Sequence, residues 1–438
     1  MNRIEQYAEQ IQDLVTPFLC SKNTSVVLQL HGQSGMQKTE LAKYYAQKHG
    51  ALYYSFRYLD ANIALKIFLP GCNNWDDFFS HLRTTKNRPV IFFDNMDDRD
   101  DKDDFICALQ EYLRTPAFVI FISHKEMDLP FPSEEIEMKP MTVHQILEYY
   151  PGMAPIDALR LCAMTDGIPA LVSQYNATLT FEENVRNFFS ADSAYLCFPQ
   201  ERLRESFRSP ESYNTLLYAM ATGYNRISQI ASFSGFPKNK CDKYIKALDA
   251  AGFIEQRVQP DGTGRMRTHY FPRGCYLKVR YQFCLPNQQN CVDGDLLQSV
   301  LTHIETVSTL ELFRMACCHW LALHNDAIYP TLLRLNDPAL CAVKIEDLPF
   351  DFVQTDGDRM IFVSIWKDVG ASFPIEMFAK IDRVTSKRNP FYNNAYVLFS
   401  VKSFSRQMEA LKEKYDNIHL IDLKSMLGKK NADIFLLD

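Results

Sequence analysis

Short apolar runs alternate with amphipathic segments along the first 130 residues of the chain. Residues 25–31, 89–94 and 117–122 have the length and composition of buried strands. Between the first two runs, residues 40–49 show helical spacing and end at Gly50. Strands and helices in alternation predict a parallel sheet that is covered by helices on both faces.

The pattern changes twice in the rest of the chain. Residues 141–205 have helical spacing, and Thr142 is placed to cap the helix that follows it. From Ser209, which is expected to cap a helix starting at Pro210, three helical segments precede two strand-like runs. A turn with proline and glycine joins the two runs, and this order is typical of a winged helix. Residues 346–438 combine four strand-like runs with two helices and predict a small α/β domain.

The eight residues after the first strand have the pattern of a phosphate-binding loop with one departure. They read G-Q-S-G-M-Q-K-T, whereas the usual pattern is G-x-x-x-x-G-K-[ST], so Gln37 takes the place of the second glycine. A strand before the loop and a helix after it are the context that such a loop requires. The predicted nucleotide-binding residues are Gly32, Gln33, Ser34, Gly35, Met36, Gln37, Lys38, Thr39 and Glu40.

The residue types in this loop suit phosphate chemistry. Amide groups at the start of a helix attract an anion, and the helix dipole adds partial positive charge. Lys38 is expected to reach the β- and γ-phosphates, and Thr39 to offer its hydroxyl to Mg²⁺. If the backbone at Gln37 must be left-handed, a residue other than glycine costs about 1–2 kcal/mol there. The alternative is an ordinary strand, turn and helix with a chance Lys-Thr pair.

Two further strand ends carry polar residues. The run 89–94 ends at Asp94, and in P-loop NTPases such a strand lies beside the loop, where its acid holds Mg²⁺ through water or through Thr39. Asn95 stands where many ATPases have a glutamate, and an amide can orient a water but cannot accept its proton. Ser123, after the third run, is a candidate sensor of the γ-phosphate. The alternative is that all three residues are simply the ends of buried strands.

With these motifs the chain resembles the archaeal-type ATPases of the AAA+ and signal-transduction NTPase group. Trp75 precedes the run 89–94, as in the W-x-x-x-F segment of that family, and Leu109-Gln110 follows the acidic strand end. Asp166-Gly-Ile-Pro169 is similar to the family's Gly-Gly-Ile-Pro turn, with an acid in place of the first glycine. The resemblance implies ATP and Mg²⁺ as cofactors, a helical lid after the NTPase core and, as in many members, a C-terminal domain of the PD-(D/E)xK nuclease type.

Pattern and resemblance together predict an α/β chain of five parts. These are a P-loop NTPase core with a parallel sheet (1–140), a helical lid (141–208), a winged helix (209–272), a helical connector (273–345) and a degenerate, nuclease-like α/β domain (346–438). An active nuclease of this type holds Mg²⁺ with one acid and with a second acid two residues before a lysine. Asp351 and Lys367 fit the first acid and the lysine, but Ile365 stands at the second acid. We therefore expect the shape of a nuclease without its activity.

Basic residues gather in the winged-helix region and make it a candidate DNA-binding surface. Contact with the DNA backbone through the third helix and the hairpin is one interpretation. The other is a solvated face on a winged helix that packs against protein, because Asp242 and Asp249 dilute the charge. The candidate contact residues are Lys238, Lys240, Lys243, Lys246, Arg265 and Arg267.

Composition excludes several other classes of function. A net charge of −6 over 438 residues argues against nucleic acid bound over the whole surface, although not against a local basic face. No run of 18 apolar residues occurs, so no membrane span is expected, and the start of the chain lacks the apolar core of a signal peptide. Twelve cysteines without a C-x-x-C pair predict free thiols in a reducing cytoplasm, without a zinc site.

Three hypotheses about function follow from the sequence. The first is an ATP-binding switch in which nucleotide moves the lid and the winged helix while hydrolysis is slow or absent. The second is a working ATPase in which Asn95 or a nearby aspartate positions the attacking water. The third is a DNA-binding or scaffold protein whose ATP site has decayed. A protein partner and self-assembly remain open in all three.

Overall fold

A computed structural model of the chain divides into two compact units. The first comprises Met1–Pro140 with Ile168–Ala170, and the second comprises Met141–Gly167 with Leu171–Asp438. Each unit is considered by itself. The structure describes residues 3–20, 24–57, 59, 61–85, 88–96, 102–190, 193–260, 265–287, 294–323, 350–356, 359–388 and 393–428.

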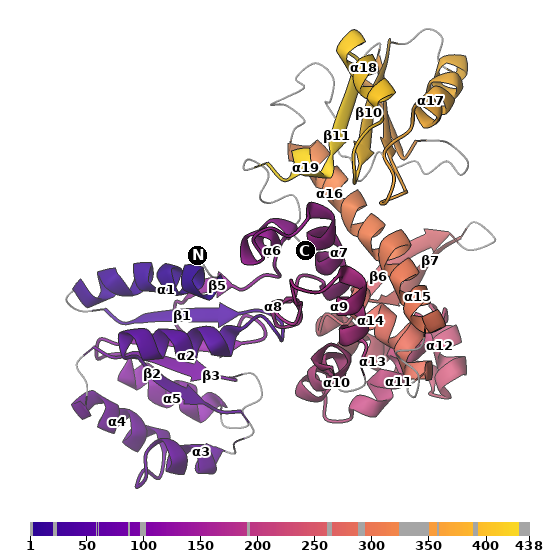
Figure 1. Ribbon diagram of the computed structural model, residues 1–438. Coiled ribbons are helices and arrows are strands. Elements are labelled where there is room, and N and C mark those ends of the chain that lie inside the picture. The colour runs from indigo at the N-terminus through magenta and orange to yellow at the C-terminus, as the bar shows by residue number, and fades with distance from the viewer. Residues whose placement is uncertain are drawn as a thin grey trace. The chain divides into compact units, whose positions relative to one another are not determined.

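A five-stranded, wholly parallel sheet forms the centre of the first unit, as the alternating pattern predicts (Figure 1). Its order is β2-β3-β4-β1-β5. The strands are β1 (Val26–His31), β2 (Leu52–Ser55), β3 (Val90–Asp94), β4 (Phe118–Ser123) and β5 (Glu134–Glu137). The helices are α1 (Arg3–Cys20), α2 (Lys38–His49), α3 (Ala61–Phe68), α4 (Trp75–Thr85) and α5 (Lys102–Tyr112).

Helices cover both faces of this sheet because the central strands are apolar on both sides. Phe92 of β3 packs against Tyr45 of α2 on one face, with ring centroids 5.5 Å apart. The next residue, Phe93, points to the opposite face and meets Phe105 of α5 at 5.1 Å. Alternate residues of one strand therefore anchor helices on opposite sides of the sheet.

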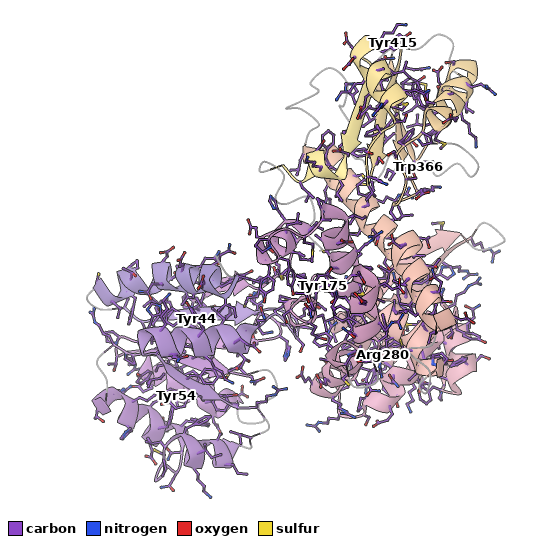
Figure 2. The ribbon with its side chains drawn as sticks, viewed as in Figure 1. Tyr44, Tyr54, Tyr175, Arg280, Trp366 and Tyr415 are labelled. Atoms are coloured by element: carbon purple, nitrogen blue, oxygen red, sulfur yellow. The ribbon has the colours of Figure 1, made fainter. Side chains whose placement is uncertain are left out.

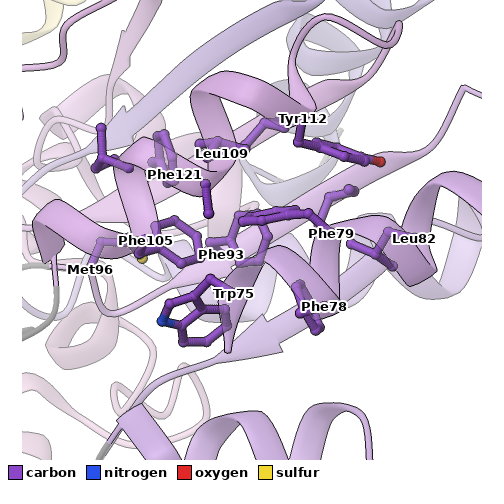
Figure 3. Packing of buried hydrophobic residues seen from close by; sticks show 14 of the residues in the cluster. Trp75, Phe78, Phe79, Leu82, Phe93, Met96, Phe105, Leu109, Tyr112 and Phe121 are labelled. Carbon is purple, nitrogen blue, oxygen red and sulfur yellow. The ribbon is translucent and has the colours of Figure 1, made fainter. Parts of the chain in front are cut away.

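An aromatic cluster fills the face of the sheet under α4 and α5 (Figure 3). Trp75 at the start of α4 meets the ring of Phe105 edge-on at 5.0 Å, and Phe79 stacks on Tyr112 at 5.0 Å. Edge-to-face pairs of this kind add about 0.5–1.5 kcal/mol each to the energy of burial. Trp75, which the sequence offers as a family marker, thus has a structural place in the core of the first unit.

The second unit begins with helices and a hairpin. The helices are α6 (Val143–Tyr149), α7 (Pro155–Thr165), α9 (Phe181–Phe188), α10 (Ala194–Ser206), α11 (Pro210–Ala221), α12 (Ile227–Ser234) and α13 (Lys238–Ala250). The short helix α8 (Pro169–Val172) crosses the boundary between the two units. Strands β6 (Ile254–Pro260) and β7 (Met266–Pro272) pair antiparallel.

Two N-caps in this unit test the capping predictions. Thr142 forms a reciprocal capping box with Gln145, so the prediction at this helix start is confirmed. Ser209 makes no side-chain capping bond, so that prediction is wrong. Its φ of −127° and ψ of 72° differ from the extended backbone of Thr142, and Pro210 at the first helical position stiffens the helix start instead.

Helices and a second sheet complete the second unit. A nearly continuous helical stretch contains α14 (Cys275–Val279), the π-helix η1 (Arg280–Cys284) and the 3₁₀ turn η2 (Leu285–Asn287). Further on lie α15 (Gly294–His303), the π-helix η3 (Ile304–Ser308) and α16 (Thr309–Leu323).

The last sheet has four strands in the order β11-β10-β9-β8. Only β8 (Phe352–Asp356) runs antiparallel to its neighbour, β9 (Arg359–Ile365). The other two strands are β10 (Asn393–Ser400) and β11 (Ile418–Asp422). The helices of this part are α17 (Ile375–Arg388), α18 (Arg406–Lys414) and α19 (Leu423–Met426). The small α/β domain expected at the end of the chain is therefore present, and no helix among the described residues could span a membrane.

Candidate functional site

The loop between β1 and α2 has the backbone conformation that its glycine pattern requires. Gly35 has a φ of 82°, and Gln37, the N-cap of α2, is left-handed with φ 67° and ψ 28°. The position of Gln37 is therefore one that glycine would occupy without strain, and the cost of about 1–2 kcal/mol foreseen from the sequence applies. Gln37 thus has a different side chain from the glycine of the usual pattern, but its backbone forms the same turn.

Lys38 closes the loop on itself. Its side chain is 8% exposed, and its Nζ donates to the carbonyl oxygen of Gly32 and, at 2.9 Å, to that of Gln33. Met36 is fully buried beneath the loop, and the carbonyl of Gly35 accepts a hydrogen bond of 3.1 Å from the amide of Ala170. An ammonium group held near the N-terminus of a helix is well placed to bind an anion.

Asp94 at the end of β3 reaches the loop, although its strand is not the neighbour of β1. In the sheet, β4 lies between β1 and β3. As expected of a strand whose end lies beside the loop, the acid accepts a hydrogen bond of 2.7 Å from Thr39 Oγ1 through Oδ2. Carboxylate and hydroxyl oxygens are the ligands that Mg²⁺ prefers, so this pair fits the ion.

Tyr53 of β2 is a member of the site that the sequence does not reveal. Its hydroxyl donates to the same Oδ2 of Asp94 at 2.7 Å. Burial raises the pKa of Tyr53, and the hydrogen bond to Asp94 raises it further, so the phenol stays protonated and remains a donor. Two hydroxyls from different elements therefore meet on one carboxylate oxygen.

The two predicted catalytic residues lie at strand ends, and each forms a hydrogen bond with another residue of the first unit. Asn95 is left-handed, with a φ of 63°, and its Nδ2 donates to Ser55 Oγ at 3.4 Å. Asparagine adopts this conformation more readily than glutamate, which gives a backbone reason for the missing acid. Ser123 is buried, and its hydroxyl donates to the carbonyl of Lys125 at 2.6 Å. The residue expected to sense the γ-phosphate thus closes a turn in this structure.

Asp351 and Lys367 differ in their surroundings. Asp351 Oδ2 accepts the amide of Ile365 at 2.7 Å, and its Oδ1 lies 3.7 Å from Arg314 Nη1. Lys367 is exposed and follows the last residue of β9 by two positions. Among the residues that the structure describes, no group of three or more His, Cys, Asp or Glu side chains could hold a metal ion.

The basic candidates after Ser209 divide by their contacts. Lys246 Nζ pairs with Asp242 at 2.7 Å, and Lys240 Nζ lies 4.2 Å from the centre of the Phe236 ring. Lys238 and Lys243 are exposed and form no ion pair with any described residue. Arg265 and Arg267 are exposed at the start of the second hairpin strand.

Fold and site together define the class of the first unit. A parallel sheet leads through β1 and a lysine-containing loop into α2, and an acid on a strand two places away bonds the threonine of the loop. This is the fold of a P-loop NTPase.

Comparison with known proteins gives distant similarities. No family model matches the chain. The uncharacterized protein MJECL04 of Methanocaldococcus jannaschii is 20% identical over 161 residues, so the chain spans about a third (36%) of that relative's length and matches it over 36% of its own.

Among solved structures, the Aeropyrum pernix ORC1 protein in complex with DNA is 13% identical with a TM-score of 0.39, covering 69% of this chain and 93% of that one. A signal transduction ATPase with numerous domains, PH0952 from Pyrococcus horikoshii, is 14% identical with a TM-score of 0.28, covering 72% and 45%. The assignment of the site therefore depends on its own geometry.

Replacement of Gln37 by glycine should stabilise the first unit. Relief of the left-handed strain, about 1–2 kcal/mol, exceeds the backbone entropy cost of glycine, about 0.5–1 kcal/mol. We expect a net gain of about 0.5–1 kcal/mol, measured by native-state hydrogen exchange of peptides from α2. Gln33→Gly is the matched control, because Gln33 has no positive φ and its replacement should give no gain. Equal effects of the two variants would contradict the assignment of strain to Gln37.

Proposed function

We propose that this chain is an ATP-binding regulatory protein, a nucleotide-dependent switch with weak or absent hydrolysis. The observation that carries the proposal is the 2.7 Å contact between Thr39 of the loop and Asp94 of β3, beside the buried ammonium of Lys38. In this proposal Lys38 and the loop amides hold the phosphates, while Thr39 and Asp94 hold Mg²⁺. The bound ion would neutralise phosphate charge there.

Slow hydrolysis follows, in this proposal, from the residues at the strand ends where an attacking water would need activation. Asn95 cannot take a proton from water, and its amide is engaged with Ser55. Ser123 donates its hydroxyl to the backbone at Lys125. A site that binds a triphosphate well and activates water poorly stays occupied for longer, which suits a switch better than a motor.

One short segment links the loop with the second unit. The amide of Ala170 bonds the loop carbonyl of Gly35, and four residues earlier Asp166 Oδ1 accepts the amide of Cys275 at 2.9 Å. A shift of the loop on nucleotide binding would therefore pull on a segment whose other end is fixed to the start of α14. In this proposal, that segment carries a change of nucleotide occupancy to the second unit.

Calorimetric titration with ATP, with and without Mg²⁺, tests the proposal. The natural chain should bind, and Lys38→Ala should weaken binding at least tenfold (about 1.4 kcal/mol or more) because it removes the buried cation. Lys48→Ala is the control, since Lys48 is exposed at the far end of the same helix. A natural chain that fails to bind would favour a decayed site.

Phosphate release separates the switch from the working ATPase. For a switch, we expect each protein molecule to hydrolyse less than one ATP during the time in which ATP binding reaches equilibrium. Sustained turnover that Asp94→Asn abolishes would instead establish the active ATPase, with Asn95 or a neighbouring aspartate positioning the water.

We infer a second function, contact with DNA, for the three helices and hairpin from α11 to β7, whose order is that of a winged helix. Support comes from Lys238 and Lys243, which are exposed and unpaired with any described residue on or at the start of α13, the third helix. Lys246 contributes less because Asp242 neutralises it.

A gel-shift titration at low salt tests this inference. The double variant Lys238→Ala with Lys243→Ala should weaken binding to a random duplex. It should also reduce the salt slope by about 2, because each lysine neutralises one DNA phosphate. Lys246→Ala, the control, should have little effect. If the natural chain shows no shift at micromolar concentration, the inference is wrong and protein packing is the better interpretation of this part.

We infer that the C-terminal α/β domain has the PD-(D/E)xK shape without nuclease activity. Ile365 supplies no oxygen ligand, and Asp351 is engaged with the amide of that residue. Pure protein should leave a supercoiled plasmid uncut in Mg²⁺ or Mn²⁺, as judged on a gel. Cutting that Lys367→Ala abolishes would overturn the inference.

A further inference from the structure

The carboxylate of Asp94 is shared between two elements of the first unit. Asp94 is 1% exposed, and a buried carboxylate is stable only where donors satisfy it. Thr39 Oγ1 and the hydroxyl of Tyr53 both donate to Oδ2, each at 2.7 Å. Because both hydroxyls use Oδ2, neither occupies the other oxygen, Oδ1.

The sheet explains why Tyr53 reaches this acid. In the β2–β3 pair, Tyr53 stands opposite Phe92 and Ser55 opposite Asp94, so Tyr53 and Asp94 lie on the same face as diagonal neighbours. This is the face covered by α2, and Lys43 of that helix lies 5.9 Å from the centre of the Tyr53 ring. The strand pairing therefore delivers a phenol to an acid that lies 41 residues away in the chain.

The neighbouring Tyr54 points the other way and has a different role. Its ring stacks near Phe93 at 5.8 Å and meets Phe78 at 5.2 Å, within the aromatic cluster of the opposite face (Figure 2 labels Tyr54). Two adjacent tyrosines of one short strand thus serve two faces of the sheet. Only Tyr53 has its hydroxyl at the site.

We propose that Tyr53 is a positioning residue for the Mg²⁺ of the bound nucleotide, an inference that rests on the proposed function. By holding Oδ2 together with Thr39, it fixes the rotation of the Asp94 carboxylate and would leave Oδ1 to hold the ion or its bound water. Groups that orient a metal ligand in this way commonly change metal affinity by about 10–100-fold when removed. Tyr53 would act on the ion through Asp94 and would not touch the nucleotide itself.

The test compares Tyr53→Phe with Tyr54→Phe, which remove one hydroxyl each from adjacent residues and keep both rings. ATP affinity is measured by calorimetry in Mg²⁺ and in EDTA, and Mn²⁺ binding to the ATP complex is followed by electron paramagnetic resonance. For Tyr53→Phe we expect the gain in ATP affinity from Mg²⁺ to fall about tenfold, with weaker Mn²⁺ binding. Affinity in EDTA should be unchanged, and Tyr54→Phe should match the natural chain in every measurement.

The outcomes distinguish the role of Tyr53 from the proposed ATP-binding function. If the natural chain binds ATP and Tyr53→Phe retains the full Mg²⁺ effect, the role of Tyr53 is wrong while the proposed function stands. If Tyr53→Phe weakens ATP equally in Mg²⁺ and in EDTA, the hydroxyl supports the fold of the loop and not the ion, and the inference again fails. If the natural chain binds no ATP, both proposals fall together.

Discussion

The burial of Asp94 is the constraint on which the first unit depends. A carboxylate at the end of a central strand, 1% exposed, must find hydrogen-bond donors. The donors are hydroxyls from the loop helix and from the edge strand β2, so one acid ties together β3, α2 and β2. The strand order places these three elements around the C-terminal end of the sheet, where ligands bind in open α/β folds. The stability of the unit and the geometry of its site thus rest on the same contact.

Much of this arrangement could be predicted from the sequence, because it depends on local patterns. The three apolar runs, the loop after the first of them and the acid at residue 94 are read directly from residue types. So is the cap at Thr142, where a threonine precedes a helix with glutamine at its third position. The cap expected at Ser209 is wrong because the backbone dihedrals of that residue, which the sequence does not display, differ from those of an extended N-cap, and its side chain makes no capping bond.

The remaining features depend on pairings between distant segments. The insertion of β4 between β1 and β3 is a property of strand order, and no local pattern encodes it. Tyr53 becomes part of the site only through the register of β2 with β3. The sequence cannot distinguish it from Tyr54, because the two are adjacent residues of the same type. The one available hint is the alternation of a strand, which predicts that Tyr53 and Tyr54 face opposite sides. It does not say which of them meets the acid.

The departures from the glycine pattern have a common physical form. Gln37 and Asp166 stand where the resemblance places glycines, and both keep the left-handed backbone that glycine would adopt, with φ of 67° and 51°. This backbone costs about 1–2 kcal/mol at Gln37 and less at Asp166, because aspartate adopts it more readily, so the surrounding contacts must hold these turns in place. The turn at Gln37 is held by the hydrogen bonds from Lys38 to the loop carbonyls and by the buried Met36. The turn at Asp166 is held by its hydrogen bond from the amide of Cys275.

Asp166 also loses stability through the burial of its carboxyl group. Its Oδ2 is buried and has no hydrogen-bond partner among the residues that the structure describes, and burial raises the pKa of the carboxyl to about 7. Because the folded pKa lies above the ordinary value, the carboxyl takes up a proton on folding between about pH 4 and 7, and its contribution to stability declines as pH rises through that range. A strained, partly satisfied acid therefore sits at one end of the segment that leads to the loop carbonyl of Gly35. The glycine-like backbone at Gln37 and Asp166 is thus strained, and the contacts of the residues that join the loop to the rest of the chain hold it in place.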